Sequence, residues 1–95
     1  DSGYERRTAF IGMMNTKDHR AFLQEILPCF DRVYFCDGFS EGEVPAEELR
    51  RISGLDGAEI FHSPRETLKF ARREGGLMYF GGSFYFAAAV REYLV

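Results

Sequence analysis

The residues best suited to bind a ligand form a Gly-Gly-Ser turn at positions 81–83. They follow four apolar residues, Leu77 to Phe80, which predict a buried strand. Gly81 and Gly82 allow a tight turn, and Ser83 can cap a helix that begins directly after it. Free backbone N–H groups, a hydroxyl and the positive end of a helix dipole then meet at one point, which favours a carboxylate or phosphate oxygen. The same turn is also used in α/β proteins for chain reversal alone.

Two charged residues, Lys17 and Asp18, follow an earlier apolar segment, residues 8–14. A lysine there can pair with a ligand carboxylate, and an aspartate can accept hydrogen bonds from an ammonium group. From residue type alone, plain surface charge is the commoner role for Lys17, and capping of the next helix is the commoner role for Asp18. Both interpretations stay open at this point.

The sequence lacks a complete catalytic apparatus. It contains no Gly-Lys-Ser or Gly-Lys-Thr P-loop and no Gly-x-Gly-x-x-Gly fingerprint. Its two histidines, His19 and His62, are isolated, and its two cysteines, Cys29 and Cys36, lack the spacing of a zinc site. We therefore predict no catalytic residue and no metal site in the chain, and an enzymatic role requires residues from outside it.

Composition indicates one small globular domain. The 95 residues carry a net charge of −3 with a pI near 5.3, which argues against nucleic-acid and anionic-membrane partners. The glutamates between residues 41 and 48 are interpreted as a solvated loop and helix start. No apolar run approaches the roughly 20 residues that span a bilayer, and the unpaired cysteines suit a reducing compartment, so we expect a cytoplasmic protein. Ten Phe residues exceed the usual need of so small a core, which leaves rings to face a partner domain or subunit.

Strands and helices must alternate along the chain to position the polar residues. After a flexible tail at residues 1–7, the apolar segments that predict strands are 8–14, 33–36, 58–61 and 77–80. Each is followed by apolar residues at helical spacing or by a helix start signal. The clearest signal is a capping box, in which Ser63 is the N-cap, Pro64 the first helical residue and Glu66 the third residue after the cap.

This alternation indicates an α/β fold with a mainly parallel four-stranded sheet and right-handed crossovers. The near-continuous apolar strands agree, because parallel strands are buried on both faces. We expect strand order 3-2-1-4, since it places the carboxyl ends of the first and fourth strands side by side at a switch point, where open α/β sheets bind ligands. Residues 12–18 would then lie next to residues 81–85.

Two segments together resemble folylpolyglutamate synthases and dihydrofolate synthases. The segment from Phe10 to Asp18 is similar to the family's Phe-Gly-x-x-x-Asp-Lys-Asp, and the segment from Gly82 to Tyr85 is similar to its Gly-Ser-Leu/Phe-Tyr/His. The elements between them follow the family's order and spacing, so the resemblance covers residues 8–95. The chain departs from the pattern at residues 15–16, where Asn-Thr replaces the usual Asp and its neighbour, and at Gly81, where Thr or Cys is common.

The resemblance implies a Rossmann-like, three-layer α/β/α domain, most of the C-terminal domain of a Mur ligase. In that family ATP phosphorylates a carboxylate of the pterin substrate, and the amine of glutamate attacks the acyl phosphate to form an amide for folate biosynthesis and one-carbon metabolism. ATP and Mg would bind mainly outside this chain. The residues that would contact glutamate are Lys17, Asp18, Ser83 and Tyr85, with a backbone anion site at Gly81 and Gly82. The domain would close over the ATP-binding domain of the parent, and the chain alone would be inactive.

The resemblance also implies that a strand beside Leu77 to Phe80 belongs to a segment absent here, Asp-Gly-Ala-His-Asn-Pro. The fourth strand would then be an open apolar edge, from which we expect self-association. Two alternatives to the ligase stay open: a free-standing nucleotide- or anion-binding domain, and a non-catalytic interaction module. Within the ligase interpretation, the acceptor is a folate, a dihydropteroate or both.

Overall fold

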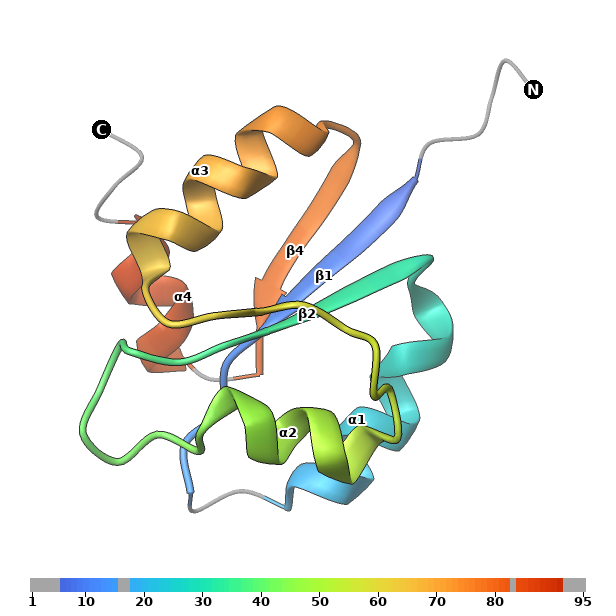
Figure 1. Cartoon of the computed structure of the whole chain (residues 1–95), viewed down its shortest axis with the longest axis vertical. Coiled ribbons are helices and arrows are strands. Elements are labelled where there is room, and N and C mark those ends of the chain that lie inside the picture. Colours follow the sequence, from blue (N-terminus) through green and yellow to red (C-terminus); the bar gives the residue numbers. More distant parts are fainter. Residues whose placement is uncertain (1–5, 16–17, 83, 92–95) are drawn as a thin grey trace.

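Four parallel strands form one sheet with helices on both faces (Figure 1). The computed structural model describes residues 6–15, 18–82 and 84–91. The strands are β1 (Arg7–Ile11), β2 (Arg32–Cys36), β3 (Ile60–Phe61) and β4 (Leu77–Gly81). The helices are α1 (His19–Ile26), α2 (Ala46–Ser53), α3 (Pro64–Glu74) and α4 (Phe84–Arg91), and a short 3₁₀ helix, η1 (Leu27–Cys29), follows α1.

The strand order is β3-β2-β1-β4, which confirms the predicted α/β fold and its order 3-2-1-4. β1 lies in the middle of the sheet, with Phe10 opposite Tyr34 of β2 and Phe80 of β4. β1 ends at Ile11 and not at residue 14, because the chain turns away to pair with the loop after β2: Val44 N donates to Met13 O at 2.8 Å. β3 has only two residues, half of the expected length.

Both faces of the sheet are buried, as apolar parallel strands require. Side chains alternate along β1, so Ala9 and Ile11 pack toward α1 and α2, whereas Phe10 packs toward α3 and α4. The two pairs of helices therefore cover opposite faces and give three layers (Figure 1). This arrangement sends the chain to one face after β1 and to the other face after β4.

Aromatic side chains fill the face of the sheet under α3. The ring of Phe10 stacks between Tyr34 at 5.2 Å and Phe80 at 5.0 Å, and the edge of Phe70 meets both Phe10 and Tyr34. Such pairs contribute about 0.5–1.5 kcal/mol each beyond their area of burial. These rings are thus used in the domain's own core, where Phe70 and Phe80 are half-buried.

The start signal of α3 at Ser63 and Pro64 acts as the sequence predicts. The Ser63 hydroxyl oxygen accepts hydrogen bonds from the backbone N–H groups of Arg65 and Glu66, and Pro64 is the first residue of α3.

At the other end of the sheet β1 begins at Arg7, and Arg6 O accepts a hydrogen bond from Leu77 N at 3.0 Å. Of the expected tail, residues 1–5 lie outside the described residues. None of the helices described is long and apolar enough to cross a membrane.

Candidate functional site

The carboxyl ends of β1 and β4 lie side by side and form the expected switch point. Ile11 is opposite Gly81 in the sheet register, and Gly12 N donates to Gly81 O at 3.1 Å. Beyond these residues the chain after β1 leads to α1 on one face, and the chain after β4 leads to α4 on the other. Open α/β sheets bind ligands at a divergence of this kind.

Two glycines permit close packing at this point. A Cβ on Gly12 would lie 2.7 Å from the Phe39 ring and 2.8 Å from the Phe86 ring. Gly82 has a φ of +94°, and a Cβ there would lie 2.9 Å from Gly12 O. Gly12 and Gly82 are therefore required by close approach, and Gly82 by conformation as well.

The structure brings together Gly81 and Gly82 with Gly12, but it gives Asp18 a local role. Asp18 Oδ1 accepts from Ala21 N at 3.1 Å and caps α1, the commoner role for an aspartate at this position. Lys17 and Ser83 lie outside the described residues. The backbone of Tyr85 is in the first turn of α4, and its side chain is outside the described part of the chain.

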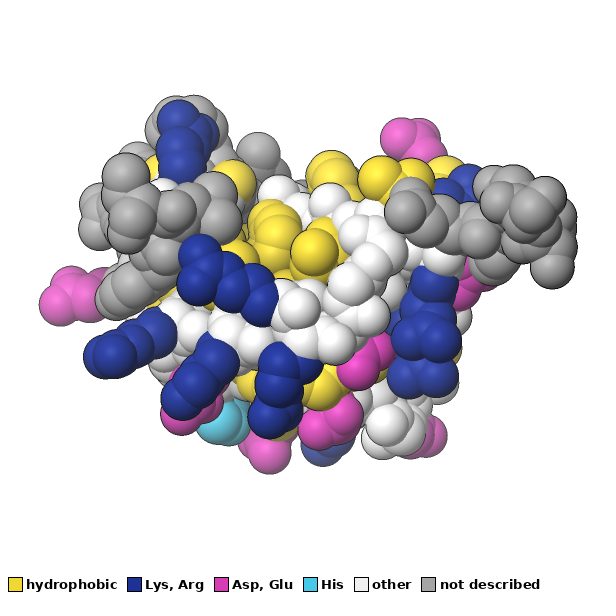
Figure 2. Space-filling view, turned by 90° about the horizontal axis from the view of Figure 1, so that it is seen from above, with side chains coloured by type: hydrophobic (Ala, Val, Ile, Leu, Met, Phe, Trp, Pro, Cys, Tyr) yellow, Lys and Arg dark blue, Asp and Glu magenta, His cyan; other side chains and the backbone are white. Residues whose placement is uncertain are grey.

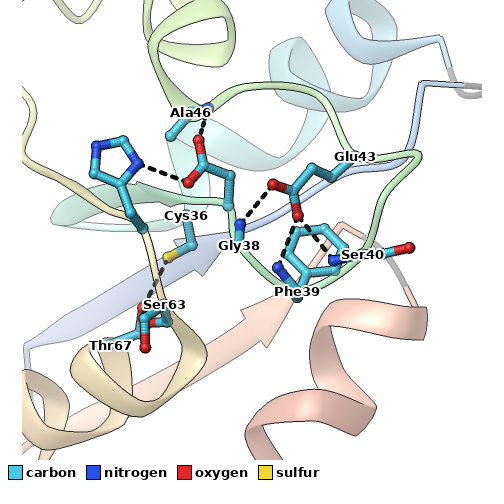
Figure 3. A network of polar contacts seen from close by, with 10 residues as sticks. Cys36, Gly38, Phe39, Ser40, Glu43, Ala46, Ser63 and Thr67 are labelled. Carbon is cyan, nitrogen blue, oxygen red and sulfur yellow. Dashed lines mark hydrogen bonds and ion pairs between the residues drawn. The ribbon is translucent and has the colours of Figure 1, made fainter.

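The loop after β2 adds polar residues that the sequence analysis did not select. Asp37 is largely buried; its Oδ2 accepts from Ala46 N at 2.8 Å, and its Oδ1 lies 2.7 Å from His62 Nδ1 (Figure 3). The hydrogen bond and the charge of Asp37 raise the pKa of His62 above its usual value. Asp37 thus joins the ends of β2 and β3 and satisfies the first N–H group of α2.

Glu43 also has a structural partner, which contradicts its interpretation as a solvated loop residue. Its carboxylate accepts from the backbone N–H groups of Gly38, Phe39 and Ser40 at 2.6, 2.7 and 2.9 Å (Figure 3). The signal in the sequence is an Asp-Gly pair directly after a strand, with a glutamate five residues after the glycine. Hydrophobic periodicity and secondary-structure propensity do not detect such a contact, because both of its partners lie in one irregular loop.

The cysteines and acidic residues offer little catalytic or metal-binding chemistry. Burial raises the pKa of Cys36 to about 12, so its thiol stays protonated, and Thr67 Oγ1 donates to its sulfur at 3.5 Å. Among residues 6–15, 18–82 and 84–91, no three His, Cys, Asp or Glu side chains lie close enough to hold a metal ion. A hollow of about 420 Å³ lies on α3 and is lined mainly by Arg and Lys, away from the switch point.

Comparison with known proteins identifies the fold. The chain matches no protein-family model and no sequence of a curated protein. It is similar in structure to Mycobacterium tuberculosis folylpolyglutamate synthase complexed with ADP and AMPPCP, with a TM-score of 0.80 and 19% identity over 92% of this chain. It is equally similar to Thermotoga maritima folylpolyglutamate synthase, with a TM-score of 0.80 and 21% identity over 95% of this chain.

The match covers only part of those proteins. This chain spans 23% of the Mycobacterium tuberculosis protein and 21% of the Thermotoga maritima protein. A second Mycobacterium tuberculosis structure, complexed with ADP, gives a TM-score of 0.78 over the same shares. The chain therefore has the fold of a region that makes up about a fifth of these folylpolyglutamate synthases.

Proposed function

We propose that the chain is the C-terminal, glutamate-binding domain of an ATP-dependent ligase of the folylpolyglutamate or dihydrofolate synthase type. Such a ligase joins L-glutamate to a carboxylate of folate or dihydropteroate through an acyl phosphate. The shared fold, with TM-scores of 0.78 to 0.80, supports this assignment. The two segments whose sequences resemble the family are a further observation in its favour.

The observation that carries the proposal is the contact between those two segments. They lie at opposite ends of the sequence, yet Gly12 of the first donates to Gly81 and Gly82 lies against Gly12. Gly12 also makes room for the rings of Phe39 and Phe86, so the end of β1, the loop after β2 and α4 pack closely at this point. The parallel pairing of β1 with β4 brings both segments to the carboxyl edge of the sheet, where α/β folds bind ligands.

In this proposal each residue at the switch point has a defined task. Lys17 pairs with one glutamate carboxylate, and the Ser83 hydroxyl with the N–H groups that follow Gly81 and Gly82 receives the other. Asp18 Oδ1 is used by the α1 cap, which leaves Oδ2 for the substrate ammonium. Tyr85, whose backbone lies in the first turn of α4, is proposed as a further glutamate-binding residue.

ATP and Mg²⁺ are assigned to other parts of the parent protein. The sequence has no P-loop, and the described residues offer no set of metal ligands. The task of this domain is then to hold glutamate and to close over the ATP-binding domain. We expect the pure 95-residue chain to show no glutamate-dependent ATP turnover.

The test is the affinity for L-glutamate, measured by NMR titration of the wild-type chain and the Lys17→Ala variant. Loss of one charge-assisted hydrogen bond should weaken binding about tenfold or more. Lys69→Ala removes an exposed lysine on α3 and serves as the matched control, with unchanged affinity expected. Equal affinities for L-glutamate in all three proteins would show that Lys17 does not bind it.

A further inference from the structure

Three successive backbone N–H groups in the loop after β2 converge on one carboxylate. They belong to Gly38, Phe39 and Ser40, and both oxygens of Glu43 accept from them (Figure 3). Consecutive N–H groups that point to the same side form a concave nest, a structure that proteins use to bind phosphates and other anions. Here the anion in the nest is a side chain of the same loop.

The backbone conformation of the nest is fixed at Gly38. Gly38 has a φ of +84°, and a Cβ there would lie 1.9 Å from His62 O, so no other residue fits. The neighbouring Asp37 does not compete for the three donors, because Ala46 and His62 engage its two oxygens. The first donor, Gly38, is therefore held in place by contacts that do not involve Glu43.

The nest lies beside the switch point. The ring of Phe39 lies against Gly12 and packs on Phe86, at a centroid distance of 5.2 Å, which attaches the nest to the switch point. Glu43 forms a backbone bridge with Met14, in the loop that follows β1. Gly38 is exposed, and Phe39 and Ser40 are half-buried, so an anion can reach the donors from solvent.

We propose that the N–H groups of Gly38, Phe39 and Ser40 form an oxyanion-binding site that Glu43 occupies in this conformation, and that a ligand oxyanion replaces Glu43 there. A carboxylate and a phosphate present the same acceptor chemistry to three N–H donors. The Glu43 side chain can rotate into solvent when it is replaced, since its loop is at the surface. The proposal depends on the geometry of this loop and holds whether or not the chain comes from a glutamate ligase.

The experiment removes the internal anion and supplies free ones. Glu43→Ala and Glu43→Gln are titrated with inorganic phosphate and, separately, with acetate, and the amide resonances of Gly38, Phe39 and Ser40 are followed by NMR. We expect both variants to bind at these amides with at least tenfold higher affinity than the wild-type chain. The stronger of the two anions identifies the source of the oxyanion, a phosphate or a carboxylate. Glu47→Ala, which removes the same charge from the start of α2, should behave as wild type.

Stability gives a second readout if a variant folds poorly. The midpoint of thermal unfolding of Glu43→Ala should rise with anion concentration more steeply than that of wild type, because a free anion then binds only the folded chain. Shifts that are absent at the three amides, or equal in Glu47→Ala, would mean an adventitious ion only and would overturn the proposal. Failure of either variant to fold at any anion concentration would also overturn it. L-Glutamate shifts at Gly12, Gly81 and Gly82 report the proposed function separately, so either proposal can fail alone.

Discussion

Gly82 is the residue on which the switch point most directly depends. We predict that Gly82→Ala lowers the free energy of unfolding by about 1–3 kcal/mol, because alanine is strained at a φ of +94° and its Cβ would approach Gly12 O at 2.9 Å. Urea unfolding measures this change. Gly57→Ala is the control, since no atom lies within 4 Å of a Cβ at Gly57. Equal stability of the two variants would contradict the close approach of the two loops.

His62 makes the stability of the domain depend on pH. The pKa of His62 is raised in the folded chain, mainly by the hydrogen bond with Asp37. The contribution of His62 to the free energy of unfolding is therefore full below the pKa of the unfolded chain and is lost as pH rises through the pKa of the folded chain. The stability difference between wild type and His62→Ala should therefore be larger at about pH 5.5 than at about pH 8.5. The effect is modest, because the ring is mostly exposed. Chemical denaturation at the two pH values measures it, and a difference that grows with pH would contradict the ion pair.

The family motifs could be read from the sequence, but the contacts around them could not. Gly81 departs from the usual Thr or Cys, and the structure supplies a reason: a Cβ there would lie 2.3 Å from the Tyr79 ring. Tyr79 in turn stacks on Phe30 at 5.3 Å. Similarly, the Asp-Gly pair before Glu43 marks a turn, but it does not show that Glu43 binds three N–H groups, because that contact depends on the path of one loop.

Among the described elements, β4 exposes the most large apolar side chains. It lies at the edge of the sheet, and Leu77, Met78 and Tyr79 are exposed apolar residues. Hydrophobic side chains also appear at the surface in the view of Figure 2, between charged ones. Leu77 N donates to Arg6 O, directly before β1, so the backbone groups of Leu77 face β1. Because these groups alternate in direction along a strand, the N–H and C=O groups of Met78 and Phe80 face the open edge. This pattern favours pairing with another strand.

We predict that the chain self-associates through β4 at high concentration. Met78→Lys should shift the sedimentation profile toward monomer, because a charged edge strand resists pairing. Leu55→Lys alters another exposed apolar residue away from this edge and should leave association unchanged. A chain that stays monomeric at every concentration would contradict the prediction, and the edge would then need no partner.

Element boundaries were predictable only where local signals set them. The α3 start follows from Ser63 and Pro64, and the structure confirms it. The end of β1 could not be predicted from its apolar run, because the backbones of Met13 and Met14 pair with the loop at residues 42–44 and not with the sheet. α2 begins one residue after Pro45, and a side chain from another loop, Asp37, bonds its first N–H group.

For the whole molecule, the alternation of four apolar runs with helices predicted the α/β fold, and the strand order was predicted from the expectation of a switch point between the first and fourth strands. The same topology joins residues far apart in sequence, which is why the Gly12 and Gly82 segments could be expected to meet. The alternatives of a nucleotide-binding domain and an interaction module share this topology. They differ from the ligase domain in what binds at the switch point.

The most direct test is therefore an NMR titration of the labelled 95-residue chain with L-glutamate and, separately, with Mg-ATP. The account predicts that L-glutamate shifts the amides of Gly12, Gly81 and Gly82, whereas Mg-ATP leaves them unchanged. Shifts of these amides by Mg-ATP with no response to L-glutamate would contradict it and would assign the switch point to a nucleotide.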